Sequence, residues 1–209
     1  MTKYYHGSNQ LFTQFELDRA GEGTGVKFGY GIYLTSRYET AAHYSWPRKA
    51  TSVEHNYVYT LEIPQPTAEN TLNLDPAVAL SASLIQLVED KLGETLPEEA
   101  IAEPKYLRKY VGNLMLWRQN TEQKKPTVKQ MIGKASVASE KAGAAFFISI
   151  GLLYYQWPVD WKNPAKGHNI AVLEEKNIQI NTIEEVQLDE KKHQLIEGTQ
   201  KEIKLQVYG

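Results

Sequence analysis

The chain has 209 residues, of which 42% are hydrophobic and 11% aromatic, with a formal net charge of −2 and no cysteine. This length holds one domain with its own core, and the apolar content excludes a disordered chain. The lack of cysteine excludes disulfides and thiolate metal sites.

Nothing in the sequence indicates a membrane span or a secretory leader. No run approaches the roughly 18 apolar residues that a transmembrane helix needs. The first residues lack the apolar stretch of a signal peptide and lead directly into a predicted strand. We therefore expect a cytoplasmic protein that does not bind membranes, with leaderless secretion as the alternative.

The N-terminal part of the chain has the period of two that is typical of strands. A short helix over residues 36–45 interrupts this pattern, with Ser36 as its expected N-cap. The last strand of the group stops at Pro64, which cannot donate a hydrogen bond to a sheet. The three predicted strands are residues 3–8, 28–34 and 55–63.

The middle of the chain has a helical pattern from Asp75 to about Glu103. Asp75 is the expected N-cap, and Pro76 follows at the first helical position. Further helices are expected over residues 104–120 and 134–150. The apolar face of the first helix, which precedes Gly93, consists of Leu84, Leu87, Val88 and Leu92.

After a loop rich in Trp, Pro and Gly over residues 151–167, the strand pattern returns. The sequence therefore predicts an α+β fold with a split, mostly antiparallel core of about six to eight strands. We expect a single domain over residues 1–209, with residues 75–134 as a helical insertion. The C-terminal strands are expected at residues 169–173, 177–180 and 203–207.

Charge is distributed unevenly along the chain. Residues 1–104 hold 7 basic and 14 acidic side chains, a net −7, whereas residues 105–209 hold 16 and 11, a net +5. Residues 105–166 alone hold 11 basic and 3 acidic side chains, a net +8. Five aromatic residues are interleaved with these charges: Tyr106, Tyr110, Trp117, Trp157 and Trp161.

This basic segment has two interpretations. Basic and aromatic residues together suit an acidic acceptor, either a nucleic acid or a protein patch, with Lys124, Lys125 and Lys129 among the contacts. Charge runs are more commonly solvated helix faces. In that second interpretation, which we favour, the aromatic residues are core and the solvated positions include Lys105, Arg108 and Lys109.

Two short motifs carry the functional signal. The first is the tripeptide His6-Gly7-Ser8, and the second begins as Phe-Gly-Tyr-Gly-Ile-Tyr-Leu and spans residues 28–44. Its glycines, Gly29 and Gly31, permit positive φ and close approach of a ligand to the main chain. Its tyrosines, eleven residues apart, suit two aromatic walls of one cleft. Such a cleft, with a histidine and glycine amides, fits a flat polar ring such as nicotinamide.

The order and spacing of these motifs resemble the diphtheria-toxin-like ADP-ribosyltransferases, the superfamily of the poly(ADP-ribose) polymerases. That family has His-Gly-Ser/Thr on its first strand and Phe-Gly-x-Gly-Ile-Tyr followed by a second tyrosine eleven residues later. The stretch from Tyr5 to Ser45 is most similar to the ADP-ribosyltransferase-like domains of phage and mobile-element polyvalent proteins. Further similar stretches are residues 15–18, 21–25, 57–64, 73–75 and 169–173.

The resemblance implies an NAD site built from both motifs. His6 would hydrogen-bond the adenosine ribose, and the Gly7 backbone would hold the nicotinamide carboxamide beside the Ser8 hydroxyl. Tyr33 and Tyr44 would stack on the nicotinamide; the alternative is that both rings are core. The other histidines show no metal-ligand spacing, so we predict no metal site. Gly31 is a further cofactor-binding candidate. Arg19 is a candidate for binding the pyrophosphate, with a surface residue as the alternative.

The chain departs from the family at the third catalytic position. Poly(ADP-ribose) polymerases have a glutamate that opens a late strand, and the matching residue here is Asn169. An asparagine amide takes up no proton near neutral pH, so it cannot act as a general base, although it can hydrogen-bond a ribose hydroxyl. Glu174 and Glu175 are candidate substitutes, of which only Glu175 would share the face of Asn169 on a regular strand. Alternatively, Asn169 is a turn residue after Gly167.

The leading hypothesis is an NAD-dependent mono-ADP-ribosyltransferase with His6, Tyr33 and Asn169 as its catalytic residues. NAD would be a substrate, and a protein or nucleic acid would accept the ADP-ribose. One alternative is a non-catalytic NAD or ADP-ribose binding module, which the asparagine favours, and another is an NAD glycohydrolase. The sequence leaves the acceptor and the oligomeric state open.

Overall fold

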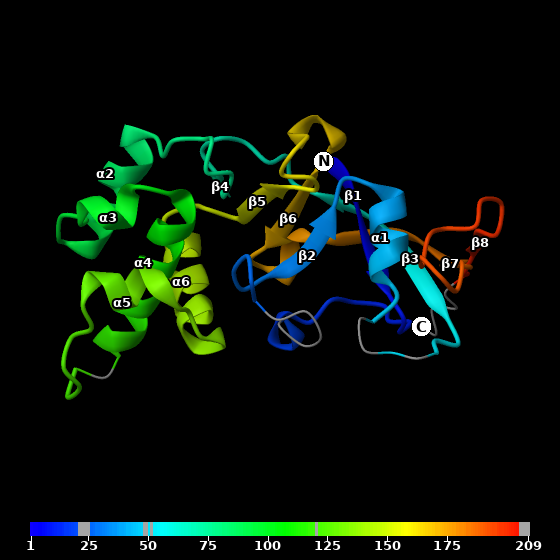
Figure 1. The fold of residues 1–209 in the computed structure, drawn as a ribbon, viewed down its shortest axis with the longest axis horizontal. Helices are drawn as coiled ribbons and strands as arrows, with labels where there is room; N and C mark the ends of the chain where they lie inside the picture. The colour runs from blue at the N-terminus through cyan, green and yellow to red at the C-terminus, as the bar shows by residue number, and fades with distance from the viewer. Residues whose placement is uncertain (21–25, 48–49, 51, 120, 205–209) are drawn as a thin grey trace. The chain divides into compact units, whose positions relative to one another are not determined.

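The computed structural model describes residues 1–20, 26–47, 50, 52–119 and 121–204. By its contacts the chain divides into two compact units, whose elements are labelled in Figure 1. Both units contain helices and strands, and most strand pairs are antiparallel. The predicted α+β class and mostly antiparallel pairing are therefore confirmed. The first unit comprises residues 1–18, 32–65 and 158–209, and the second comprises residues 19–31 and 66–157.

The strands of the first unit form an antiparallel array in the order β6-β2-β1-β3-β7-β8. The N-terminal strand β1 is central, because it pairs with β2 on one side and β3 on the other. The 3-10 turns of this unit are η2 (Pro164–Lys166) and η3 (Glu175–Asn177). The strands are β1 (Thr2–Ser8), β2 (Ile32–Thr35), β3 (Asn56–Ile63), β6 (His168–Val172), β7 (Gln179–Val186) and β8 (Lys201–Glu202).

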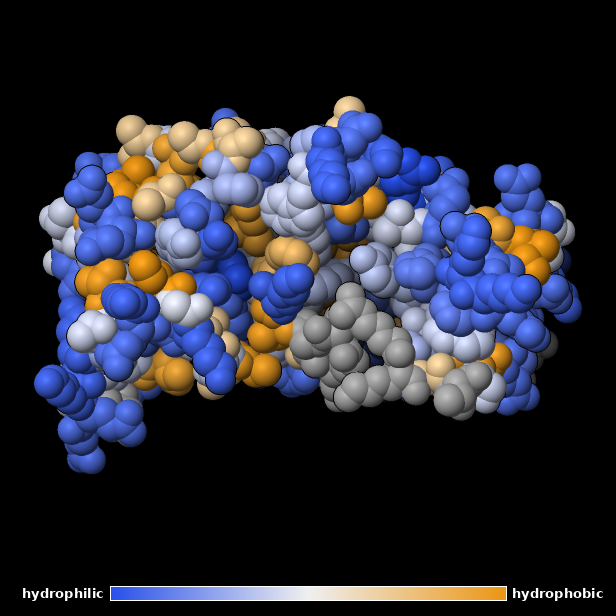
Figure 2. All heavy atoms as spheres, viewed as in Figure 1, coloured by the Kyte–Doolittle hydropathy of each residue, from blue (hydrophilic) through white to orange (hydrophobic). Residues whose placement is uncertain are grey.

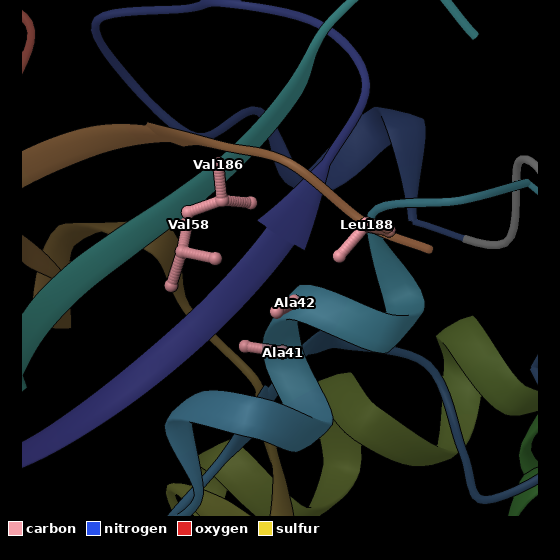
Figure 3. Close-up of a cluster of buried hydrophobic side chains, with 5 residues drawn as sticks. All are labelled: Ala41, Ala42, Val58, Val186 and Leu188. Carbon is pink, nitrogen blue, oxygen red and sulfur yellow. The ribbon is translucent and has the colours of Figure 1, made fainter. Parts of the chain in front are cut away.

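Helix α1 (Tyr38–Tyr44) covers one face of this array. It presents Ala41 and Ala42, whose small side chains let the helix approach the strands closely. Figure 3 shows these alanines facing Val58 of β3 and Val186 of β7, with Leu188 beside them. Burial of this cluster against the strands fixes α1 in place, since packing rather than propensity stabilises a helix this short.

The second unit is mainly helical. Helices α4 and α6 cross at two glycines, because a Cβ on Gly143 would lie only 3.0 Å from the Cα of Gly112. Strands β4 (Thr71–Asn73) and β5 (Tyr154–Pro158) pair in parallel. The 3-10 turn η1 (Leu17–Arg19) ends on the first residue of this unit. The helices are α2 (Ala82–Leu92), α3 (Glu98–Ile101), α4 (Pro104–Arg118), α5 (Val128–Gly133) and α6 (Val137–Ser149).

The start of α1 differs from the expectation. Arg37, not Ser36, occupies the N-cap, and it makes no capping hydrogen bond with its side chain. The Ser36 hydroxyl instead accepts from the His168 backbone N–H at 3.0 Å. Ser36 therefore ties the start of β6 to the end of β2.

The first predicted helix begins later than expected. The Asp75 carboxylate accepts from the Ala77 N–H at 2.9 Å, which makes a local turn rather than a helix cap. Helix α2 starts only at Ala82, where the Ser81 hydroxyl accepts from Leu84 N–H, and it ends at the left-handed Gly93 as predicted. Leu87 was assigned to the buried face but is 42% exposed.

The loop expected over residues 151–167 contains a strand, β5, built from Tyr-Tyr-Gln-Trp-Pro. These aromatic residues favour strands, and Pro158 ends the strand rather than excluding it. The edge strand expected at residues 203–207 lies partly outside the described residues. The organisation expected from the sequence, one domain with an insertion at 75–134, stays a prediction.

On the face seen in Figure 2, hydrophilic residues cover most of the visible surface and apolar patches are small. Exposed large apolar side chains include Val137 and Trp161. In the part of the chain that the structure describes, no helix is both long enough and apolar enough to cross a membrane.

Candidate functional site

His6 of β1 is bonded to the backbone of β2. Its Nδ1 lies 2.8 Å from the carbonyl oxygen of Tyr33. Because a carbonyl only accepts, Nδ1 carries the proton and Nε2 is the acceptor of the neutral ring. Burial lowers the pKa of His6, which keeps the ring neutral near pH 7. The Nδ1–H group already donates to the Tyr33 carbonyl, so a ligand hydroxyl would have to donate to Nε2.

Three aromatic rings surround His6. Phe15 lies edge-on with its ring centroid at 5.1 Å, and Phe12 and Tyr59 follow at 6.1 Å each. The buried Tyr59 hydroxyl accepts from the Phe12 N–H at 2.8 Å and donates to the Gln10 carbonyl at 3.0 Å. These bonds hold the segment after β1 against the histidine. Sequence reasoning missed this cluster, although Tyr59 alternates with Tyr57 on a predicted strand and the two phenylalanines are three residues apart.

Gly7 is where α1 meets β1. A Cβ at this position would lie 1.8 Å from the carbonyl oxygen of Ala41 and 2.8 Å from the backbone nitrogen of Ser45. The glycine is therefore required for packing, whatever its backbone does for a ligand. Tyr44 lies between Ala41 and Ser45 in the sequence, in the last turn of α1, and is 51% exposed. Its ring is accessible to a ligand and is not core.

Ser8 ends β1 and shapes the turn that follows. Its hydroxyl oxygen accepts from the Gln10 N–H at 3.0 Å, so the hydroxyl proton remains available as a donor. The predicted role of Ser8 beside a ligand amide is compatible with this local bond.

Gly29, Gly31 and Arg19 lie in the second unit. Gly29 takes a φ of +109°, whereas Gly31 is not among the described glycines with positive φ. The space at Gly29 is filled by the Tyr155 ring, since a Cβ would lie 2.4 Å from its Cδ2. Arg19 ends η1 and is exposed. The cofactor roles of Gly31 and Arg19 stay predictions.

Tyr33 and Asn169 lie on one face of neighbouring strands. Tyr33 is opposite Ala171, and Thr35 is opposite Asn169. Directly opposite residues share a face, as do residues two apart, so the Tyr33 and Asn169 side chains are diagonal neighbours with Cβ atoms roughly 7 Å apart. This is also the face of Tyr5, which pairs with Thr35 and packs edge-on to Tyr38 of α1 at 5.4 Å.

Asn169 is a strand residue, so its alternative assignment to a turn is wrong. Asn169 is 8% exposed. Its side-chain amide is not among the buried side-chain groups that lack a hydrogen-bond partner in the described part of the chain. An asparagine amide carries both a donor and an acceptor, so it has the chemistry to bond a ligand hydroxyl on this face.

Neither candidate glutamate can replace Asn169 directly. Strand β6 ends at Val172, before both of them. Glu174 accepts from the Lys176 ammonium at 2.8 Å, and Glu175 begins the turn η3. The regular strand on which Glu175 would have shared the face of Asn169 does not extend that far.

Two cavities lie elsewhere. A cavity of about 1020 Å³ in the first unit is lined by Trp46, Asn56, Glu185 and His193, among others. A cavity of about 510 Å³ in the second unit is lined by Asn113, Trp117 and Gln130, among others. The lining of neither includes a predicted NAD-binding residue. Among the described residues, no group of three or more His, Asp or Glu side chains is arranged to hold a metal ion.

Two partly buried histidines, His6 and His168, make the first unit sensitive to acid. Burial lowers the pKa of both His6 and His168, whereas an unfolded histidine titrates near 6.5. The His168 Nε2 lies 2.5 Å from the Tyr4 hydroxyl oxygen. Below about pH 6.5 the unfolded state binds more protons, so the free energy of unfolding falls as pH decreases. Urea titrations at pH 7.5 and 5.5 should show this loss, and it should be smaller in a His6→Gln/His168→Gln variant.

The pKa of His55 is shifted in the opposite direction, so His55 serves as the matched control. Its Nδ1 lies 2.6 Å from the Glu185 carboxylate, and this hydrogen bond raises the pKa of His55. The stabilisation it gives is complete below pH 6.5 and is lost as pH rises through the raised pKa. His55→Gln should therefore increase the loss on acidification. Equal losses in the parent and the double variant would refute the assignment to His6 and His168.

No protein-family profile, curated protein or solved structure matches this chain.

Proposed function

We propose that this protein is a mono-ADP-ribosyltransferase with an ADP-ribosyltransferase-like fold. It would cleave NAD at the bond between nicotinamide and ribose and pass ADP-ribose to a macromolecule. The observation that carries the proposal is the 2.8 Å bond between His6 Nδ1 and the Tyr33 carbonyl, which joins the two sequence motifs on adjacent strands. Asn169 lies on the next strand, β6, and is 8% exposed.

Each candidate residue would contact a different part of NAD. His6 Nε2 would accept from a hydroxyl of the adenosine ribose, and the Gly7 backbone would hold the carboxamide. The exposed Tyr44 ring would stack on the nicotinamide from the end of α1, and Tyr33 would line the opposite wall. Asn169 would bond the nicotinamide ribose on the Tyr33 face.

The chemistry needs positioning more than a base. The C1′–N bond breaks and its electron pair goes to the ring nitrogen, so neutral nicotinamide leaves and the ribose becomes cationic. An acceptor lone pair then bonds to C1′, and the acceptor proton goes to water. Asn169 can orient the sugar during this step but cannot take the proton. Acceptors that are nucleophilic without deprotonation are therefore favoured.

A second candidate function is a non-catalytic NAD or ADP-ribose binding module. It is favoured by the absence of a carboxylate at position 169 and by the engagement of Glu174 with Lys176. An NAD glycohydrolase uses the same bond cleavage with water as the acceptor. Incubation of the protein with labelled NAD and cell lysate separates the three. Label on macromolecules supports transfer, nicotinamide release without label supports hydrolysis, and binding without release supports the module.

The basic segment bears on the acceptor. Arg108 was expected to be solvated but is 2% exposed and paired with Glu140, so it cannot contact an acceptor. Tyr110 and Trp157 are core, as the solvated-face interpretation expects, but Trp161 is 48% exposed and is not core. Lys124, Lys125 and Lys129 are exposed, and these side chains stay the proposed contacts for an acidic acceptor.

Tyr44→Ala should weaken NAD binding. Loss of one stacking ring costs about 1–3 kcal/mol by analogy with base–aromatic stacking, or roughly 5- to 150-fold in Kd. Because the ring is half exposed, the variant should fold normally. Titration calorimetry measures the affinity, with Trp161→Ala as a control, since Trp161 is 48% exposed and outside the proposed site. An unchanged Kd for Tyr44→Ala would exclude this ring from the site.

A further inference from the structure

A buried ion pair in the second unit contacts the turn that precedes Gly31. Arg108 of α4 pairs with Glu140 of α6, and their side chains are 2% and 3% exposed. Nη2 of Arg108 also donates to the Lys27 carbonyl oxygen at 3.3 Å. That carbonyl belongs to a turn closed by the bond from Gly29 N–H to the Val26 oxygen, at 3.0 Å. One guanidinium thus connects two helices to this turn.

Gly29 fits closely against the same surface. A Cβ at Gly29 would lie 2.4 Å from Cδ2 of Tyr155 and 3.2 Å from Nη1 of Arg108. The guanidinium carbon of Arg108 in turn lies 5.9 Å from the centroid of the Tyr155 ring. The turn therefore packs on a surface formed by Arg108 and Tyr155, and it has no room for a side chain there.

Stability alone does not account for this ion pair. Desolvating two charges is costly, and well-packed apolar residues often give equal or greater stability. Among the described residues, Nε and Nη1 of Arg108 have no hydrogen-bond acceptor other than the ion-pair contact with Glu140, and unfilled buried donors add to the cost. What Arg108 supplies, and an apolar residue would not, is a directed bond to the Lys27 carbonyl.

We propose that the Arg108–Glu140 ion pair positions the turn at residues 26–29 and, through it, Gly31 for ligand binding. Glu140 orients the guanidinium, and the guanidinium holds the turn. Arg108 and Glu140 are thus positioning residues for this turn. The effect on NAD binding rests on the proposed function, whereas the effect on the turn does not.

The test replaces both charges with apolar residues of similar size, Arg108→Met/Glu140→Leu. The helices should stay packed, so the urea midpoint should equal or exceed that of the parent. Hydrogen exchange at the Gly29 amide should become at least about ten-fold faster, because the turn loses its bond to Arg108 and opens locally more often. Amides in the centres of α4 and α6 should exchange as in the parent, which controls for general loosening.

Arg108→Lys is a second variant, because it keeps a cation for Glu140 but lacks the planar fork that also reaches Lys27. It should show the same faster exchange at Gly29 even where the double variant does not fold. In nicotinamide-release assays, both changes should raise the KM for NAD about ten-fold with little change in kcat.

Unchanged Gly29 exchange in a folded variant would overturn the proposal. Faster exchange with an unaltered KM would overturn its extension to Gly31. If the parent neither binds nor cleaves NAD, the proposed function fails, and the exchange rates still decide whether the ion pair holds the turn.

Discussion

Gly7→Ala should destabilise the protein by about 3 kcal/mol, at the upper end of the range for overpacking. The new methyl group would lie 1.8 Å from the Ala41 carbonyl oxygen, and backbone on both sides must move to admit it. For a chain of this size that loss corresponds to a fall of roughly 6–12 °C in the unfolding midpoint. Calorimetric or circular-dichroism melting measures the shift.

Gly133→Ala is the matched control, because a Cβ there meets nothing within 4 Å and Gly133 is not among the described glycines with positive φ. Its midpoint should change little or rise slightly, since alanine favours the helix. A Gly7→Ala midpoint equal to that of the control would show that α1 is not held against β1 as described. If α1 instead shifts, NAD binding should be lost together with stability, because Tyr44 moves with the helix.

Asn169→Glu should raise the rate of nicotinamide release by about ten-fold or more while NAD affinity is retained. A carboxylate at this position stabilises the ribose as it becomes cationic, and fixed charges in a buried site have large effects on rate. The side chain is only 8% exposed, so a carboxylate in place of the amide would be poorly screened by water. Single-turnover release of labelled nicotinamide, together with calorimetry, separates rate from affinity.

Asn169→Gln controls for side-chain length, since it adds the same methylene without charge. A rate increase with Glu but not Gln would assign the effect to the charge. If Asn169→Glu folds and binds NAD but loses an activity that the parent has, the asparagine is itself adapted to the reaction, and the expectation is wrong.

The sequence predicted the central strand β3 well, because β-branched and aromatic residues favour strands. The strand expected over residues 55–63 is observed as Asn56–Ile63, between β1 and β7. Prediction from the sequence failed where local and long-range bonds compete. Ser36 has the chemistry of a helix cap, yet its hydroxyl bonds His168, 132 residues away. Asp75 likewise forms a local turn, which no apolar pattern reveals.

Among the candidate site residues, spacing indicated which lie together but not why each is there. His6 reaches only the backbone carbonyl of Tyr33, because the side chains of His6 and Tyr33 lie on opposite faces of the paired strands. Gly7 and Gly29 read as ligand contacts, whereas each also makes room for a neighbour, α1 in one case and Tyr155 in the other. The buried Arg108 could have been recognised, because it lies three residues before Val111 on the apolar stripe of its helix.

The pairing of β2 with β6 determines how late in synthesis the array of strands can be completed. Thr35 pairs with Asn169, so 134 residues must follow Thr35 before its partner exists. At about 5–20 residues per second, ribosomes need roughly 7–27 s for that length. Throughout this interval β1, β2 and β3 can associate while the outer edge of β2 remains unpaired. An unpaired apolar edge attracts other strands, so the nascent chain is exposed to aggregation at Ile32–Thr35 until β6 emerges.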